Sequence, residues 1–173
     1  SLALVIADKP GIRAIERARE GDVACAVIPR KEPGFEEKVL AALRNYKIDM
    51  VVLAGFLGIL SREFIQAFPG PIINIHPSLI PAFCGKGFYG LKVHQAALDY
   101  GVKVTGATVH YVNEVPDGGK IILQRAVDIL PGDTAEVLQR RVMEQAEWKL
   151  LPAAAELVAA DVVAAEAASA AKE

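Results

Sequence analysis

Cysteine, net charge and long apolar runs are all scarce in this sequence of 173 residues. Its two cysteines, Cys25 and Cys84, cannot form a disulfide framework and lack the spacing of metal ligands. The net charge of −2 comes from scattered charges of both signs, which argues against a nucleic-acid-binding surface. The strongest apolar run, residues 50–60, is too short to span a bilayer. We therefore expect a reduced, cytoplasmic protein that binds no metal, nucleic acid or membrane.

Apolar runs of strand length alternate with segments that have helical spacing, and Pro or Gly separates many of them. The expected strands are residues 2–7, 23–28, 49–54, 71–75, 103–112 and 120–130. The expected helices are residues 12–20, 35–46, 61–68, 91–100 and the segment from 134 onward. A turn at 116–119 predicts a hairpin between the last two strands. The pattern predicts a single three-layer α/β domain over residues 1–173. Its sheet is expected to be mostly parallel with an antiparallel hairpin at one edge, and residues 155–173 form an Ala-rich helical tail.

The segment Ile73-Asn74-Ile75-His76-Pro77 carries the strongest functional signal. Alternation along a strand places the Asn74 carboxamide and the His76 imidazole on one face, and Pro77 keeps His76 extended. Ligands bind at the carboxyl ends of strands in open α/β sheets. A fixed donor beside a titratable donor is suited to stabilising an oxyanion. The segment therefore predicts an active site, bordered by the Gly/Pro-rich loop 76–90.

Three further titratable residues give weaker signals. His94, on the helix 91–100, is typical of a packed or solvated histidine. His110 shares a strand face with Thr108 and is as consistent with a pocket position as with a structural one. Asp117 lies in an Asp-Gly-Gly turn, where a carboxylate commonly bonds its own backbone. In the other interpretation Asp117 faces His76 across the cleft and keeps a proton on the imidazole, and spacing does not decide between the two.

Several blocks of residues occur in an order known from one enzyme family. They are Val52-Leu53-Ala54-Gly55-Phe56, Asn74-Ile75-His76-Pro77-Ser78-Leu79-Ile80-Pro81, Gly106-Ala107-Thr108-Val109-His110, Asp117-Gly118-Gly119 and Ile122-Leu123-Gln124. Together they resemble the phosphoribosylglycinamide formyltransferases, the folate-dependent enzymes of purine synthesis. The resemblance extends over residues 2–157 and implies the Rossmann-like formyltransferase fold. It also suggests a cis peptide bond before Pro81.

The resemblance implies a catalytic set of Asn74, His76 and Asp117. These residues would transfer the formyl group of 10-formyltetrahydrofolate to the amine of glycinamide ribonucleotide, with Asn74 and protonated His76 holding the oxyanion. Folate would contact Leu57, Gly58, Ile59, Leu60 and Asn74, and the same pocket would be lined by Thr108, His110 and Gly85. Folate is a co-substrate, so the resemblance implies no bound cofactor and no metal. The expected partners are these two small molecules, and the expected assembly is a monomer or a homodimer.

The family begins with a central strand and a glycine-rich loop that cradles the substrate phosphate, and the sequence shows no match to either. Ala7-Asp8-Lys9-Pro10 corresponds to the end of the family's second strand. Because unpaired buried backbone groups are costly, we expect this sequence to be part of a longer protein with about 30 further residues before Ser1.

Two alternatives to this function stay open. Formyltetrahydrofolate deformylase shares a strand like 101–111, although its histidine is usually followed by a second His and a Phe, where this sequence has Pro77 and Leu79. The second alternative is a binding module and not an enzyme: a truncated folate-binding domain without catalytic activity. It stays open because a fold does not establish a function. Methionyl-tRNA formyltransferase needs a more basic surface than a net charge of −2 supplies.

Overall fold

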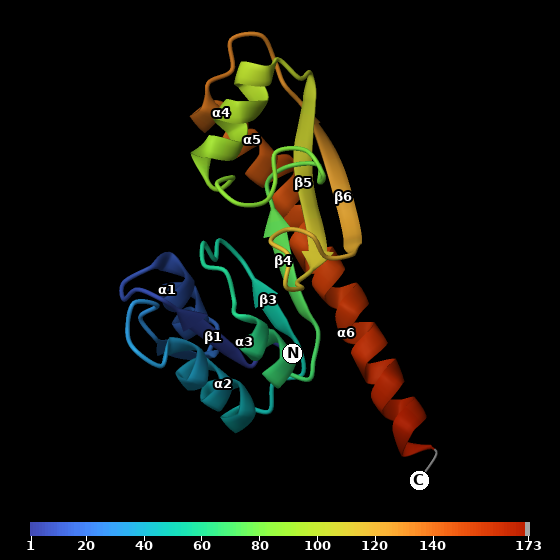
Figure 1. Ribbon diagram of the computed structural model, residues 1–173. Coiled ribbons are helices and arrows are strands. Elements are labelled where there is room, and N and C mark those ends of the chain that lie inside the picture. Colours follow the sequence, from blue (N-terminus) through green and yellow to red (C-terminus); the bar gives the residue numbers. More distant parts are fainter. Residues whose placement is uncertain (172–173) are drawn as a thin grey trace. The chain divides into compact units, whose positions relative to one another are not determined.

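The computed structural model describes residues 1–171, which divide into two compact units (Figure 1). The smaller unit comprises residues 1–49 and 66–70. The larger unit comprises residues 50–65 and the chain from Pro71 onward, and it contains every residue of the candidate site described below.

The smaller unit is built from two parallel strands and two helices. Strand β1 (Leu4–Ala7) pairs with β2 (Ala24–Val27), so that Leu4 lies opposite Ala24. Helix α1 (Arg13–Glu20) connects the strands and buries Ile15 and Ala18, which lie three residues apart on one face. Helix α2 (Phe35–Asn45) follows β2 and buries Leu43. All four elements lie within the segments that the sequence predicts.

The larger unit contains a four-stranded sheet in the order β3-β4-β5-β6. Its strands are β3 (Val51–Leu53), β4 (Ile72–His76), β5 (Val104–Tyr111) and β6 (Ile121–Asp128). Strands β3 and β4 are parallel, whereas β5 is antiparallel to both of its neighbours. The hairpin predicted at the edge of the sheet is β5–β6. The change from parallel to antiparallel pairing already occurs between β4 and β5.

Four helical segments of the described chain lie wholly within the larger unit: α4 (Leu91–Tyr100), α5 (Ala135–Val142), the π-helical turn η1 (Met143–Glu147) and α6 (Trp148–Ala170). Helix α3 (Arg62–Ala67) begins in the larger unit, and its last two residues belong to the smaller one. Helix α3 begins as predicted, because the amide of Phe64 donates to Ser61 Oγ at 3.0 Å. The sequence predicts one helix from Thr134, but the structure interrupts it with η1 and accommodates Pro152 inside α6. The predicted tail is helical through Ala170, and positions 172–173 of that prediction lie outside the described residues.

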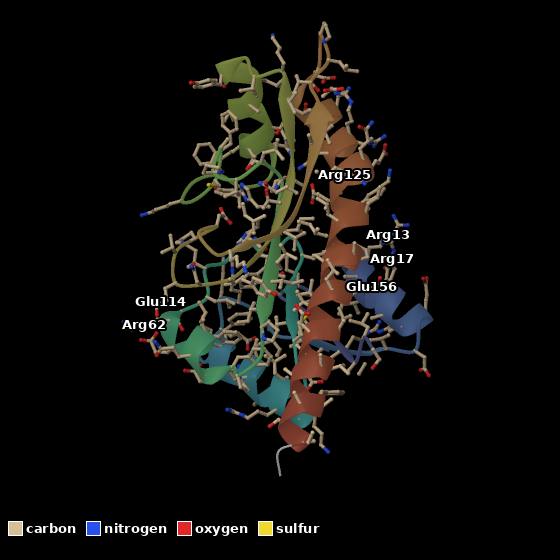
Figure 2. All side chains as sticks on the ribbon, turned by 90° about the vertical axis from the view of Figure 1, so that its right-hand side faces the viewer. Arg13, Arg17, Arg62, Glu114, Arg125 and Glu156 are labelled. Carbon is tan, nitrogen blue, oxygen red and sulfur yellow. The ribbon has the colours of Figure 1, made fainter. Side chains whose placement is uncertain are left out.

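The core of the larger unit lies between the sheet and the helices α5, η1 and α6. Its buried members are Ile73, Ile75, Ala107, Val109, Val127, Leu138, Val142, Ala146, Leu150, Ala154 and Val158. Figure 2 shows the guanidinium of Arg125 near these helices, where its Nη1 donates to the Gln145 carbonyl at 3.2 Å. The same view shows the exposed ion pair of Arg62 with Glu114 at 2.9 Å. Within residues 1–171, no helix combines the length and apolarity needed to cross a membrane.

Replacement of Leu138 by Ala tests this core. Leu138 is 0% exposed on α5, so we expect its truncation to lower the free energy of unfolding by about 2–5 kcal/mol. Its neighbour Val137 is 49% exposed, and Val137→Ala is expected to change stability by less than about 0.5 kcal/mol. Urea unfolding of both variants measures the difference, and equal losses would show that α5 does not pack as described.

Candidate active site

The pairing of β4 with β5 gathers the first polar residues of the site. Asn74 lies opposite His110 and His76 lies opposite Thr108. Because side chains alternate along each strand, these cross-strand pairs share one face of the sheet. Strand β4 ends at His76, so the site lies at its carboxyl end, as expected from the sequence.

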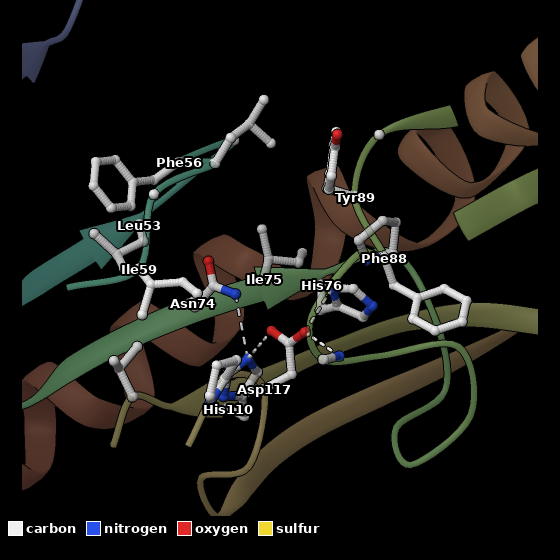
Figure 3. Close-up of a pocket in the computed structure, with 18 of the residues that line it drawn as sticks. Leu53, Phe56, Ile59, Asn74, Ile75, His76, Phe88, Tyr89, His110 and Asp117 are labelled. Carbon is white, nitrogen blue, oxygen red and sulfur yellow. Dashed lines mark hydrogen bonds and ion pairs between the residues drawn. The ribbon is translucent and has the colours of Figure 1, made fainter. Parts of the chain in front are cut away.

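A cavity of about 430 Å³ opens on this face of the larger unit (Figure 3). Asn74, His76, His110 and Asp117 line it together, so the structure brings the three predicted catalytic residues into one cavity. The segment Leu57, Gly58, Ile59 and Leu60 lines the same cavity, as does Gly85. Leu57 and Ile59 are 62% and 68% exposed, which leaves an accessible apolar surface beside the polar groups.

Asp117 enters the cavity from the turn between β5 and β6. Its backbone has φ 54°, and the two glycines that follow it allow the turn to approach β5 closely. A Cβ atom on Gly119 would lie 1.7 Å from the Tyr111 carbonyl oxygen, so no other residue fits there without a shift of the backbone. The carboxylate points back at the histidines rather than at its own turn (Figure 3).

The Asp117 carboxylate is held by three groups from different parts of the chain. Its Oδ2 accepts from the Gly85 amide at 2.8 Å and lies 3.5 Å from His76 Nδ1. Its Oδ1 lies 3.6 Å from His110 Nε2. Burial alone would raise the pKa of Asp117, but hydrogen bonds from His110 and Gly85 and the nearby histidine charges outweigh burial, and the pKa is lowered. Asp117 is therefore a carboxylate at neutral pH.

Both ring nitrogens of His76 face hydrogen-bond acceptors. Nε2 lies 2.9 Å from the Phe83 carbonyl oxygen, and Nδ1 faces Asp117. The contact with the Phe83 carbonyl is a hydrogen bond and orients the ring so that Nδ1 faces the Asp117 carboxylate at 3.5 Å. The His76 side chain is 5% exposed.

His110 connects Asn74 with Asp117. Its Nδ1 lies 2.9 Å from the Tyr111 carbonyl and donates to it, because a carbonyl oxygen only accepts. Its Nε2 lies 3.2 Å from Asn74 Nδ2 and 3.6 Å from Asp117 Oδ1. The second N–H of the Asn74 amide is left to bind another group, and Asn74 lines the cavity.

Thr108 is not among the residues that line the cavity, although the resemblance implies that it would be. Its side chain is 0% exposed, and its hydroxyl bonds the Ser78 carbonyl, the Ile80 amide and the Gln124 side chain. Cys84 lies in the neighbouring loop, where Sγ donates to the Pro81 carbonyl at 3.3 Å. Burial, and secondarily the charge of Asp117, raises the pKa of the Cys84 thiol. The Ile80–Pro81 peptide is cis, as the resemblance suggests.

His94, expected to be an ordinary packed or solvated residue, is buried in the wall of the cavity. It is 0% exposed, and neither of its ring nitrogens has a hydrogen-bond partner among the described residues. Burial, and secondarily the charge of His76, lowers the pKa of His94 from 6.5 to about 4. His94 is therefore neutral at neutral pH.

Three further lining residues come from helices at the other side of the cavity: Gln139 of α5 and Met143 and Glu147 of η1. Burial raises the pKa of Glu147. No signal in the sequence points to these residues, because the segment has the pattern of a continuous helix and the π-helical turn has no pattern of its own.

The described residues do not suggest a metal centre. Among them, no cluster of three or more His, Cys, Asp or Glu side chains is arranged to hold an ion. The cavity is lined by hydrogen-bond donors, by the Asp117 carboxylate, by the Glu147 carboxyl group and by apolar side chains.

The fold and the site agree with comparisons to known proteins. The family described as formyl transferase matches residues 1–155. The chain therefore belongs to the formyl transferase family. Within that family, the relatives and solved structures that match it include proteins named phosphoribosylglycinamide formyltransferase.

Three of these matches indicate the degree of similarity. The chloroplastic phosphoribosylglycinamide formyltransferase of Arabidopsis thaliana is 42% identical over 154 residues, which cover 86% of this chain and 52% of that protein. The trifunctional purine biosynthetic protein adenosine-3 of Gallus gallus is 40% identical over 94% of this chain and 16% of that protein. The crystal structure of phosphoribosylglycinamide formyltransferase from Anaplasma phagocytophilum gives a TM-score of 0.84 at 37% identity, covering 93% of this chain and 76% of that one. The chain thus spans about half of its plant relative and a small part of the trifunctional protein.

The burial of His94 predicts a pH dependence of stability. The unfolded chain takes up a proton at this residue near its ordinary pKa of 6.5, but the folded chain does so only near pH 4. Stability is therefore lost as the pH falls through this window, by about 3 kcal/mol in total. Urea unfolding near pH 7 and near pH 5 should show a smaller loss for His94→Leu than for the wild type. Equal losses in the two proteins would contradict the neutral, buried state of His94.

Proposed function

We propose that this protein transfers the formyl group of 10-formyltetrahydrofolate to the amine of phosphoribosylglycinamide, a step of purine biosynthesis. The convergence of Asn74, His76 and Asp117 in one cavity carries the proposal. The names of the matched relatives, phosphoribosylglycinamide formyltransferase and a trifunctional purine biosynthetic protein, support the choice of substrates. The cavity volume of about 430 Å³ is in the range of small-molecule sites.

The reaction needs an anion to be stabilised at the formyl oxygen. The amine nitrogen attacks the formyl carbon, the carbonyl electron pair moves to oxygen, and a tetrahedral intermediate forms. The donors proposed for that oxyanion are the second N–H of Asn74 and the Nδ1–H of a protonated His76, because His76 Nε2 is engaged with the Phe83 carbonyl. His110 holds the Asn74 amide by the 3.2 Å hydrogen bond, so the donor is oriented before the substrate arrives.

The reaction also moves one proton from the amine to the folate nitrogen. When the intermediate collapses, the bond between the formyl carbon and N10 breaks, and N10 takes the proton from His76 Nδ1. The proton lost by the amine passes to the Asp117 carboxylate and from there returns to His76 Nδ1, 3.5 Å away. The lowered pKa of Asp117 keeps it ionised and therefore able to accept this proton at neutral pH.

In this proposal the segment from Leu57 to Leu60 binds the pterin ring of the folate. It lines the cavity beside Asn74, and Leu57 and Ile59 present exposed apolar side chains. Such a surface suits a flat heterocycle whose edge forms hydrogen bonds while its face packs on apolar groups. In this proposal the folate is a co-substrate and the chain holds no resident cofactor. The cytoplasmic location and the monomeric or homodimeric state stay predictions from the sequence.

A formyl-transfer assay with two acceptors tests the proposal. The 173-residue chain is mixed with 10-formyltetrahydrofolate and either phosphoribosylglycinamide or water alone, and the folate absorbance is followed. We expect turnover that requires the amine. Turnover with water alone would identify a deformylase, and folate binding without turnover would identify a non-catalytic domain. Either outcome would overturn the proposal.

His76→Ala tests the assignment of the proton donor. Loss of both the oxyanion contact and the proton donor is expected to lower kcat by at least about 100-fold. The far-ultraviolet circular dichroism of the variant should match the wild type, because the side chain lies at the end of β4. Near-native turnover of a folded His76→Ala protein would remove His76 from the mechanism.

A further inference from the structure

One residue of the cavity wall carries a charge that the proposed chemistry does not use. Lys86 is the only lysine or arginine among the described residues that line the cavity. Its side chain is exposed, and within residues 1–171 its ammonium has no hydrogen-bond or ion-pair partner. The ionisable groups of Asp117 and Glu147 line other parts of the wall. An anionic group of a bound substrate would therefore find its one lysine or arginine partner in this wall at Lys86.

A tight turn presents Lys86 at the cavity. The Phe88 amide donates to the Gly85 carbonyl at 3.1 Å. Lys86 and Gly87 are the two central residues of this turn, and Gly87 has φ 96°, which a glycine adopts without steric cost. At one end the Gly85 amide donates to Asp117 Oδ2 at 2.8 Å, and at the other the Phe88 ring packs edge-on against a second aromatic ring at 6.3 Å. Both ends of the turn are thus held, while the Lys86 side chain stays accessible.

The same segment gives the cavity an aromatic surface. Phe88 and Tyr89 both line the cavity, and Tyr89 is 47% exposed. Lys92, in the first turn of α4, holds the Tyr89 side chain: its Nζ donates to Tyr89 Oη at 3.1 Å and lies 4.6 Å from the ring centroid. Figure 3 shows the two rings on one side of Asn74 and Ile59 on the other. The aromatic surface is therefore separate from the segment proposed to bind the pterin.

The folate co-substrate has groups that match this combination. A folate carries its pterin at one end, then an aminobenzoyl ring, and then a glutamate with free carboxylates. The segment from Leu57 to Leu60, proposed to bind the pterin, has no charged side chain. The aminobenzoyl ring suits the exposed Tyr89, and a carboxylate suits the ammonium of Lys86. The ribonucleotide offers a phosphate but no aromatic ring, so the aromatic residues beside Lys86 favour the folate.

We propose that the segment 85–89 binds the tail of the folate, with Tyr89 packing on the aminobenzoyl ring and Lys86 pairing with a carboxylate of the glutamate. Lys86 is then a residue that determines specificity for the tail and takes no part in the chemistry at the formyl carbon. The inference rests on the proposed function for the identity of the co-substrate. Binding of the tail can nevertheless be measured without turnover.

Three substitutions and two ligands test the contact. Lys86→Gln removes the charge but keeps a polar side chain, and Lys86 is exposed in a turn, so the fold is not at risk. Lys103→Gln is the matched control, because Lys103 is an exposed lysine of the same unit that does not line the cavity. Tyr89→Ala removes the ring. The ligands are tetrahydrofolate, which carries one glutamate, and tetrahydropteroate, which keeps the aminobenzoyl ring and lacks the glutamate.

The first readout is the dissociation constant of each ligand, measured by calorimetry on the full chain. Lys86→Gln is expected to weaken tetrahydrofolate about fivefold, the upper range for an exposed charge pair, and to leave tetrahydropteroate unchanged. Tyr89→Ala should weaken both ligands by the same factor, and Lys103→Gln should change neither. Added salt should reduce the preference of the wild type for tetrahydrofolate over tetrahydropteroate. Equal weakening of both ligands by Lys86→Gln would overturn the inference.

The second readout is formyl transfer, where Lys86→Gln should raise KM for 10-formyltetrahydrofolate about fivefold. Its kcat and its KM for phosphoribosylglycinamide should stay within about twofold of the wild type. A raised KM for the ribonucleotide alone would overturn the inference and assign Lys86 to the phosphate. An inactive wild type in which Lys86→Gln still weakens tetrahydrofolate but not tetrahydropteroate would overturn the proposed function and support the tail site. A wild type that binds neither ligand would overturn both.

Discussion

The contact between the Asp117 carboxylate and His76 is the interaction on which the rest of the site depends. Asp117 faces His76 at 3.5 Å and His110 at 3.6 Å, and it anchors the loop through the Gly85 amide at 2.8 Å. One carboxylate thus joins the end of β4, strand β5 and the loop that borders the cavity. It reaches this position because Gly119 lets the turn approach Tyr111 of β5 more closely than a side chain would permit, and Gly118 packs tightly on Val115 within the turn. Its negative charge lies beside the imidazole that donates the proton in the proposed transfer.

The antiparallel register of β4 and β5 supplies the second constraint. It places His110 beside Asn74 and Thr108 beside His76. The β5–β6 register then puts Gln124 of β6 next to Thr108. His110 contacts the Asn74 amide in the cavity, whereas the Thr108 hydroxyl bonds the Ser78 carbonyl and the Ile80 amide in the turn after His76. A slip of one residue in this register would send all of these side chains to the opposite face.

Much of the site could be predicted from the sequence where periodicity decides it. The strand period of two placed Asn74 and His76 on one face, and apolar runs identified each strand and helix to within a few residues. Asp117 could not be placed by spacing, because its distance from His76 depends on how a hairpin folds back. Thr108 was expected in the pocket, but its face is covered by the 78–83 turn. The burial of His94 in the cavity wall and the position of Glu147 could not be predicted, since the first depends on helix packing and the second on a π-helical turn. The chemical roles proposed for these residues came from the family resemblance. The match to the formyl transferase family supports the resemblance itself.

A double-mutant cycle on Asp117 and His76 tests the central claim most directly. The measured quantity is kcat/KM for formyl transfer in the wild type, Asp117→Asn, His76→Ala and the double variant. If Asp117 acts through the protonated ring of His76, its replacement has little further effect once His76 is gone, and the double variant should be nearly as active as His76→Ala. Losses that simply add would show that the two residues act independently, and would contradict the account given above.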